Sequence, residues 1–140
     1  MPSNPRPQNF IATDASCLGN PGVLEFRAMW GDTNKVIFQR GPYEHGTNNI
    51  GEYLALVLAL IWCQKNGYKN MPIYTDSVTA MAWVRKKKVG TKLIKNEKNE
   101  QLFNSMQIAQ EWLNNNEYHN PILKWDTDAW GEIPADYGRK

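Results

Sequence analysis

The chain has 140 residues, 41% of them hydrophobic and 6 of them tryptophan, and its formal net charge is only +2. This composition predicts one folded domain over residues 9–140, after a disordered, proline-rich leader at residues 1–8 that lacks the apolar core of a signal peptide. A membrane protein is excluded because the longest apolar run, residues 54–63, is about half of what a membrane span needs. The 2 cysteines lack the spacing of metal ligands, which excludes a zinc site and indicates a reducing, cytoplasmic setting.

Hydrophobic periodicity and the positions of glycine, proline and asparagine predict the elements in chain order. Strands are expected at residues 9–16, 23–30, 35–40, 72–75 and 121–125. Helices are expected at residues 50–65, 77–87 and 97–114, with a last short helix after Gly131. Three meandering strands followed by alternating helices and strands predict an α/β fold, with one mixed sheet and helices packed on its faces.

Capping residues predict where two of these helices begin. A loop at residues 41–49 leads into the first helix, and Asn49 followed by Glu52 fits an N-cap with a capping-box acid. In the last helix, Pro134 fits a position near the first turn.

Basic residues are concentrated in one stretch of the chain. Seven of the 16 lysines and arginines lie within residues 85–98, together with one acid, Glu97. Such a stretch predicts either a surface that follows phosphates or a solvated helix face, and from the charges alone the solvated face is favoured.

Four acids are predicted near the ends of elements, and each has a structural explanation when it is taken alone. Asp14, near the end of the first strand, fits a turn, and Glu52 fits its capping box. Asp76 fits a helix N-cap, and Asp136 fits the first turn of a helix, where it would complement the helix dipole.

Together the four acids indicate a metal site. If the strands that carry Asp14 and Asp76 lie side by side, both carboxylates reach the same edge of the sheet, and Glu52 and Asp136 could approach from its flanks. Converging carboxylates need cations, and oxygen ligands without histidine or cysteine indicate Mg²⁺ or Mn²⁺. A pair of such ions about 4 Å apart is the usual device for phosphodiester hydrolysis.

The segments around these acids resemble the successive motifs of type 1 ribonucleases H, in family order and at family-like spacing over residues 10–140. They read TDAS at residues 13–16 with GNPG at 19–22, TNNIGE at 47–52 and YTDS at 74–77. The ending, WGEIPADYGRK at residues 130–140, resembles a bacterial branch that lacks the family's mobile loop with a catalytic histidine.

The resemblance implies a ribonuclease H-like fold with a five-stranded mixed sheet, and a catalytic domain at residues 9–140. It implies a monomeric endonuclease, not bound to membranes, that cuts the RNA strand of RNA–DNA hybrids and leaves 5′-phosphate and 3′-hydroxyl ends. Two Mg²⁺ ions, for which Mn²⁺ can substitute, would be held by Asp14, Glu52, Asp76 and Asp136. Glu132 would lie near one metal and aid turnover.

The resemblance also implies a substrate groove. Cys17, Gly19, Asn20 and Asn48 match positions that touch RNA 2′-hydroxyls, the group that distinguishes RNA from DNA. Thr47, Asn49 and Thr91 match a pocket that binds a phosphate of the DNA strand. Trp83 matches an exposed aromatic residue that packs on a deoxyribose. Ser77, in the third motif, matches a residue that binds substrate.

One departure from the family pattern concerns recognition of the RNA strand. Val78 stands where many members carry a glutamine that contacts the minor groove, so this recognition is expected to be weaker or shifted. His119 is expected to be a surface residue rather than the missing catalytic histidine.

Two other functions stay open. Another nuclease of the same fold superfamily, such as an integrase or a Holliday-junction resolvase, usually lacks the GNPG and TNN segments found here. A non-catalytic hybrid-binding module would keep a basic groove but would not need four intact acids.

Overall fold

Five strands form a single sheet in the computed structural model, which describes residues 5–138. The strands are β1 (Ile11–Gly19), β2 (Gly22–Trp30), β3 (Val36–Gly46), β4 (Ile73–Thr75) and β5 (Ile122–Lys124). Their order across the sheet is β3-β2-β1-β4-β5, with β1, β2 and β3 antiparallel, β4 parallel to β1, and β5 parallel to β4. The predicted five-stranded mixed sheet is therefore confirmed.

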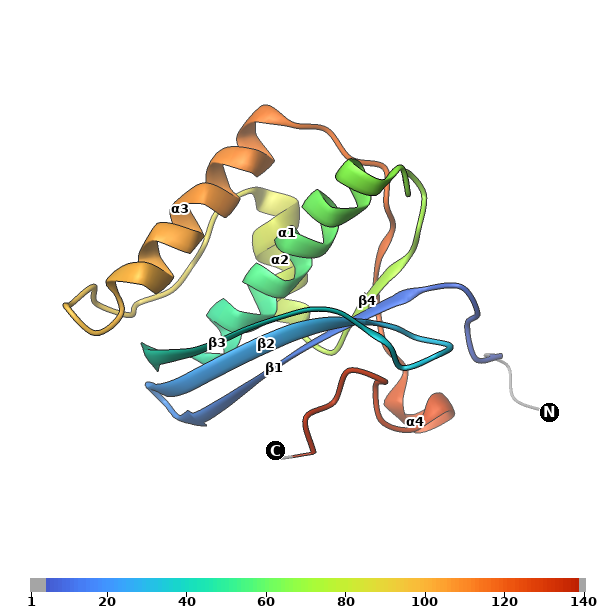
Figure 1. The fold of residues 1–140 in the computed structure, drawn as a ribbon, viewed down its shortest axis with the longest axis horizontal. Coiled ribbons are helices and arrows are strands. Elements are labelled where there is room, and N and C mark those ends of the chain that lie inside the picture. Colours follow the sequence, from blue (N-terminus) through green and yellow to red (C-terminus); the bar gives the residue numbers. More distant parts are fainter. Residues whose placement is uncertain (1–4, 139–140) are drawn as a thin grey trace.

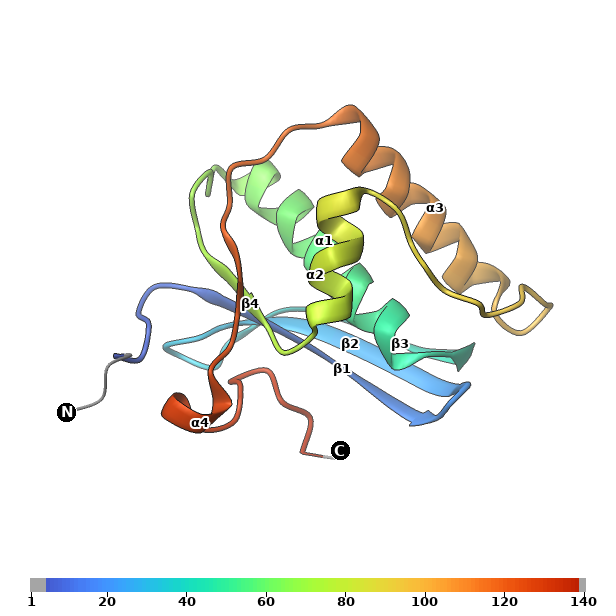
Figure 2. The ribbon, with the colours of Figure 1, turned by 180° about the vertical axis from the view of Figure 1, so that it is seen from behind.

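Helices cover this sheet unequally. Those of the described residues are α1 (Asn48–Asn66), α2 (Val78–Lys86), α3 (Glu100–Asn115) and α4 (Thr127–Trp130). The first three lie on one side of the sheet, whereas α4 and the C-terminal segment that follows it lie on the other (Figures 1 and 2).

The strand alternation divides the core between the two faces. Ile11 and Ala15 of β1 pack into the large cluster under α1, which is buried along most of its length. Phe10 and Ala12 point the other way, into a small cluster with residues such as Ile133 of the C-terminal segment. Asp14 shares the face of Ala12, so it lies under the C-terminal segment.

Two predicted boundaries near the first helix are wrong. The predicted loop at residues 41–49 is mostly strand, because β3 continues to pair with β2, through bulges, as far as Gly46. The N-cap of α1 is Thr47 rather than Asn49, since the Thr47 side chain accepts a hydrogen bond from the backbone amide of Ile50. The helix therefore begins two residues before the predicted start.

The helix predicted after Gly131 is also wrong. The short helix α4 precedes this glycine, which ends it at a φ of 80°. Residues 131–138 form no regular helix, because Ile133 and Ala135 are buried against the sheet and the carbonyls of Ala135 and Asp136 accept hydrogen bonds from Arg27. Tertiary contacts therefore override the local helix signal.

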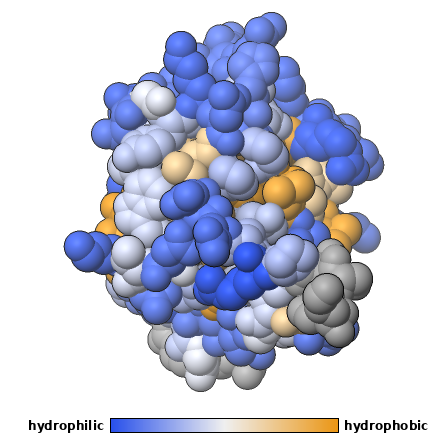
Figure 3. All heavy atoms as spheres, turned by 90° about the vertical axis from the view of Figure 1, so that its right-hand side faces the viewer, coloured by the Kyte–Doolittle hydropathy of each residue, from blue (hydrophilic) through white to orange (hydrophobic). Residues whose placement is uncertain are grey.

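Two further predictions concern the leader and membranes. Residues 1–4 of the predicted leader lie outside the described residues, and residues 5–8 are in no helix or strand. No helix within residues 5–138 is long and apolar enough to cross a membrane. The side of the molecule seen in Figure 3 is mostly hydrophilic, with small apolar patches.

Candidate active site

Asp14 and Asp76 are brought together by the pairing of β1 with β4. These parallel strands place Ile11 beside Ile73 and Ala12 beside Tyr74, so Asp76, the first residue after β4, follows at the level of Asp14. Asp14 lies in the middle of β1, not near its end as predicted, and its exposed fraction is 0%. The side-by-side arrangement that the metal hypothesis needed is thus present.

Glu52 lies between these two strands. One of its carboxylate oxygens, Oε1, accepts a hydrogen bond from the Ala15 amide at 3.1 Å, and the other, Oε2, accepts one from the Thr75 hydroxyl at 3.4 Å. The predicted capping box is wrong, because Glu52 is 1% exposed and turned toward the sheet. It occupies the place where β4 has ended and β1 continues, bound to the residue after Asp14 and the residue before Asp76.

Asp76 faces the last strand and α4. Its Oδ1 atom accepts a hydrogen bond from the Thr127 hydroxyl at 3.5 Å and lies 3.9 Å from Nζ of Lys124. The N-cap of α2 is the next residue, Ser77, whose side chain accepts a hydrogen bond from the Ala80 amide. The helix-cap explanation of Asp76 is therefore wrong.

Asp136 reaches the same region from the other end of the chain. Arg27 of β2, directly opposite Asp14 in the sheet, donates hydrogen bonds to the carbonyls of Ala135 at 2.9 Å and Asp136 at 2.8 Å. The carboxylate of Asp136 accepts a hydrogen bond from the Gly138 amide at 3.0 Å. Sequence reasoning missed Arg27, and its one available signal was its position opposite Asp14 in the first hairpin.

The donor set fits a hard divalent cation in its chemistry, since it consists of carboxylates. As the side chains stand, however, no three Asp, Glu, His or Cys residues are grouped closely enough to hold a metal ion in the part of the chain that the structure describes. Glu52, Asp76 and Asp136 are each bound by protein donors instead. Coordination by the four acids therefore stays a prediction.

Glu132 is exposed and follows Gly131, the residue that ends α4. The helical i, i+4 relation considered for Glu132 and Asp136 is absent, because residues 131–138 form no regular helix. Any approach of Glu132 to the other acids must come from this irregular segment, and its role stays a prediction.

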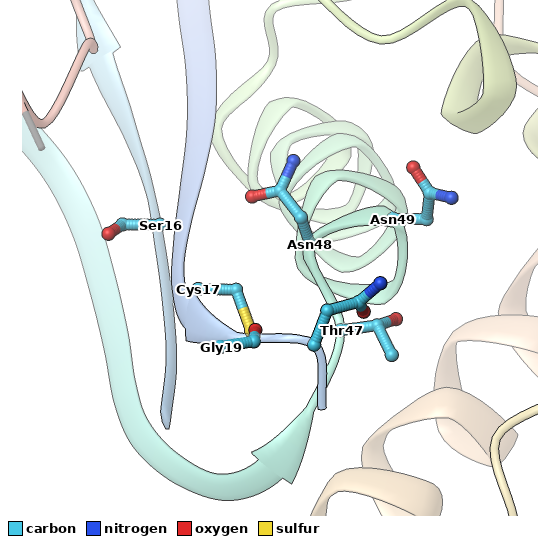
Figure 4. Close-up of a pocket in the computed structure, with 7 residues that line it drawn as sticks. Ser16, Cys17, Gly19, Thr47, Asn48 and Asn49 are labelled. Carbon is cyan, nitrogen blue, oxygen red and sulfur yellow. The ribbon is translucent and has the colours of Figure 1, made fainter. Parts of the chain in front are cut away.

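A polar pocket lies where β1 ends and α1 begins (Figure 4). Its volume is about 430 Å³, and it collects six of the predicted substrate-binding residues: Cys17, Gly19, Asn20, Thr47, Asn48 and Asn49. Figure 4 shows the first residues of α1 facing the turn after β1 across this pocket. Two motifs far apart in the sequence thus form one surface.

The thiol of Cys17 acts as a donor in this pocket. It donates to the carbonyls of Gly19 at 3.0 Å and Gly46 at 3.3 Å. Burial raises the pKa of the Cys17 thiol, although a hydrogen bond with the Gly22 backbone opposes the shift, so the thiol stays protonated at neutral pH.

The other predicted substrate-binding residues do not line this pocket. Ser77 caps α2, and the Thr91 hydroxyl accepts a hydrogen bond from the Leu93 amide in the loop after α2. Trp83 is half-buried rather than exposed, because its ring packs edge-on against Tyr53 with the centroids 6.1 Å apart. Their part in substrate binding stays a prediction.

Three comparisons place the chain among known proteins. A family model described as RNase H matches residues 6–125. A protein named ribonuclease H from Agrobacterium fabrum is 34% identical, over 82% of this chain and 78% of its own length. Another protein of that name, from Neorickettsia sennetsu, is 40% identical over 48% of this chain. The matched region is 44% of that relative's length.

Solved structures with the same fold include LC11-RNase H1, isolated from compost, with a TM-score of 0.50 and 20% identity over 86% of this chain and 87% of that one. The structure of LC11-RNase H1 in complex with an RNA/DNA hybrid gives a TM-score of 0.50 and 19% identity over 85% of this chain and 86% of that one. At this identity the likeness concerns the fold alone, and it agrees with the predicted ribonuclease H-like fold.

Proposed function

Because the chain belongs to the RNase H family, we propose that it is an endonuclease that hydrolyses the RNA strand of RNA–DNA hybrids. Membership confirms the family predicted from the motifs and, with it, an enzyme of the ribonuclease H class. The observation that carries the proposal is the bridge that Glu52 forms between Ala15, next to Asp14, and Thr75, next to Asp76.

The burial of these carboxylates favours catalysis over simple binding. Asp14 is 0% exposed and Glu52 is 1% exposed, and buried carboxylates are costly unless they are paired or coordinate a metal. A hybrid-binding module would gain nothing from acids beside phosphates, because they repel the nucleic acid. A buried acidic centre is therefore better explained by a reaction than by affinity.

We propose that Asp14, Glu52, Asp76 and Asp136 hold two Mg²⁺ ions, for which Mn²⁺ can substitute. When bound, these ions would stabilise the charge on the attacking and leaving oxygens, with 5′-phosphate and 3′-hydroxyl products. The Thr75 hydroxyl orients Glu52, and the Thr127 hydroxyl orients Asp76. Lys124 lies beside Asp76 and would have to yield its position as a cation binds.

The pocket beside the acids suits the RNA strand. Asn20 and Asn48 offer amide donors and acceptors to a 2′-hydroxyl, and the Cys17 thiol offers a weak donor. Thr47 and Asn49, at the start of α1, suit a phosphate of the DNA strand, because the first amides of a helix attract anions. We further propose that Thr91 completes this phosphate site, that Ser77 and Trp83 touch the substrate, and that the protein acts as a cytoplasmic monomer.

One assay tests the activity: the cleavage of matched RNA–DNA, RNA–RNA and DNA–DNA duplexes and of a four-way DNA junction, with and without Mg²⁺. We expect Mg²⁺-dependent cleavage of the RNA strand of the hybrid alone. Cleavage of the junction would assign the chain to another activity of the fold superfamily. Hybrid binding without cleavage would make it a binding module.

Asp14→Asn and Asp76→Asn test the acidic centre in the same assay. Both should abolish cleavage and leave hybrid binding intact or tighter, since negative charge near phosphates is removed. Glu111→Gln, an exposed acid on α3, is the matched control and should cleave normally. Cleavage by either aspartate variant at more than a few per cent of the wild-type rate would remove that residue from the reaction.

A further inference from the structure

We propose that Arg27 is a positioning residue that fixes the C-terminal segment, residues 131–138, on the sheet and thereby places Asp136 beside Asp14. The inference rests on the proposed function, because it concerns the fourth acid of that site. Arg27 acts through the backbone that carries Asp136, whose carbonyl it binds.

The position of Arg27 follows from the register of the first hairpin. Arg27 and Asp14 are direct partners in the antiparallel pairing of β1 with β2. Side chains of such partners lie on the same face of a sheet, with Cβ atoms about 5 Å apart. Met29, two residues further along β2, is buried in the small cluster with Ile133 and Ala135, so this is the face that the C-terminal segment covers.

Arg27 binds the segment at three successive residues. Its Nε and Nη2 atoms donate to the carbonyls of Ala135 and Asp136, at 2.9 and 2.8 Å. Its guanidinium carbon lies 4.2 Å from the centroid of the Tyr137 ring, a cation–π distance. A planar guanidinium with several donors in a fixed geometry can hold adjacent carbonyls in one orientation, which a lysine ammonium cannot do.

The other contacts described for the segment bind residues before Asp136 or, like the hydrogen bond from the Asp136 amide to the carbonyl of Ile133, lie within the segment itself. Ile133 and Ala135 are buried, but apolar contact has no direction. The Trp125 indole donates to the carbonyl of Gly131 at 2.8 Å, five residues before Asp136. Arg27 binds the carbonyl of Asp136 itself, so it controls the direction in which this residue leaves the backbone.

The charge of Arg27 adds a second effect. A cation opposite Asp14 offsets part of the negative charge of this buried carboxylate. Removal of the guanidinium should loosen the segment, and the misplaced Asp136 should weaken the binding of Mg²⁺, although the loss of a positive charge by itself favours a bound cation. The pocket formed by residues 16, 17, 19, 20 and 47–49 should stay intact.

The test compares Arg27→Gln and Arg27→Lys with Arg40→Gln. Arg40 is a matched control, because it is an exposed arginine of the same sheet that donates to the carbonyl of its neighbour Gln39. The reporters are the amides of Asp136 and Gly138, which are hydrogen-bonded within the segment, to the carbonyl of Ile133 and the carboxylate of Asp136. Their hydrogen exchange is measured by NMR, and the affinity for Mg²⁺ by calorimetry.

In Arg27→Gln we expect both amides to exchange about tenfold faster or more, with amides of β1 and α1 unchanged, because the loss is local. The affinity for Mg²⁺ should fall several-fold. The kcat should fall about a hundredfold with the KM for the hybrid unchanged, the scale expected when a catalytic group is misplaced by about 1 Å. Arg27→Lys should restore only part of these losses, and Arg40→Gln should match the wild type.

Unchanged exchange of the two amides in Arg27→Gln would overturn the proposal, and so would an equal loss of protection throughout the protein. If Arg27→Gln does not fold, Arg27→Lys decides in the same way, by local or unchanged exchange. The proposed function fails if the wild-type protein does not cut hybrids. The exchange experiment does not depend on cleavage, so it still tests the role of Arg27 in that case.

Discussion

The hydroxyl of Thr75 connects two parts of the candidate site. Thr75 is fully buried at the end of β4, where its Oγ1 donates to Glu52 at 3.4 Å and accepts a hydrogen bond from the Ser77 amide at 3.1 Å. One oxygen atom thereby connects the Glu52 carboxylate to the residue that caps α2.

We predict that Thr75→Val lowers the free energy of unfolding by about 1–3 kcal/mol, because the buried Glu52 carboxylate and the partly buried Ser77 amide each lose a hydrogen bond. Activity should fall as well, since Glu52 is no longer oriented. Thr75→Ser keeps the hydroxyl and removes one methyl group, so it should cost about 1 kcal/mol and retain most of the activity. Urea denaturation and kcat measure both effects, and a valine variant as stable and active as the serine variant would contradict this role of the hydroxyl.

At the scale of elements, the basic stretch belongs to the end of α2 and the loop that follows. Arg85, Lys86, Lys87 and Lys88 are all exposed. Asn99 holds the far end of the loop, because its side-chain amide donates a hydrogen bond to the carbonyl of His45 at 3.2 Å, just before the start of α1. The basic loop is thus anchored close to the end of the molecule that carries the polar pocket.

Replacement of Lys86, Lys87 and Lys88 by glutamine should raise the KM for the hybrid while kcat is spared. In a plot of the logarithm of KM against the logarithm of the salt concentration, the slope should fall by about one for each phosphate that the lysines neutralise in the wild type. The control removes the same charge from three exposed lysines outside the stretch: Lys65 in the last turn of α1, Lys69 in the loop after it, and Lys35 between β2 and β3. KM values between 50 and 200 mM salt (about the range over which such interactions weaken) measure the effect. If both triple variants respond alike, the stretch is a solvated surface.

Glu132 lies on the irregular segment after α4 and not on a helix. Gly131, at a φ of 80°, stands directly before it, and Glu132 is exposed. A carboxylate on such a segment can compete for a metal ion or its waters as product leaves. We predict that Glu132→Gln slows multiple turnover much more than single-turnover cleavage.

The control for this prediction is Asp128→Asn, an exposed acid in α4 four residues earlier. Equal slowing of both phases by Glu132→Gln would place Glu132 in the chemical step. No slowing at all would leave it a surface residue with no part in turnover.

At the scale of the whole molecule, the burial of α1 makes the free energy of unfolding fall as the pH rises through the alkaline range. Burial raises the pKa of Tyr53 to about 12 and that of Cys63 to about 11. The folded protein keeps these protons at a pH at which the unfolded chain has released them. Above about pH 9 the folded state therefore binds more protons than the unfolded state. The stability from these groups is complete below pH 9 and is lost as the pH rises toward 11 and 12.

We predict that the free energy of unfolding falls from about pH 9 upward, and that Cys63→Ala and Tyr53→Phe each reduce the slope of this fall. Urea denaturation at intervals between pH 8 and 11 measures the slope. Slopes in both variants equal to that of the wild type would show that titration of these two groups is not coupled to unfolding.

Much of this molecule could be predicted from local sequence. Alternating apolar residues and turn chemistry gave the order of strands and helices down to β5, because these signals depend on neighbours within a few residues. The motifs identified Glu52, whose carboxylate binds the neighbours of Asp14 and Asp76, and the residues at 17, 19, 20 and 47–49 do share one pocket.

Tertiary structure decided the rest, since the deciding contacts join distant residues. Glu52 does not form the predicted capping box but accepts a hydrogen bond from the amide of Ala15, 37 positions away. This amide lies beyond the end of β4, where no strand is left to accept its hydrogen bond. The C-terminal segment does not form the predicted helix but binds Arg27, which lies 109 positions from Asp136. Local propensity is worth tenths of a kcal/mol per residue, whereas buried apolar side chains and charge-assisted hydrogen bonds are each worth about 1–3 kcal/mol, so packing determined both.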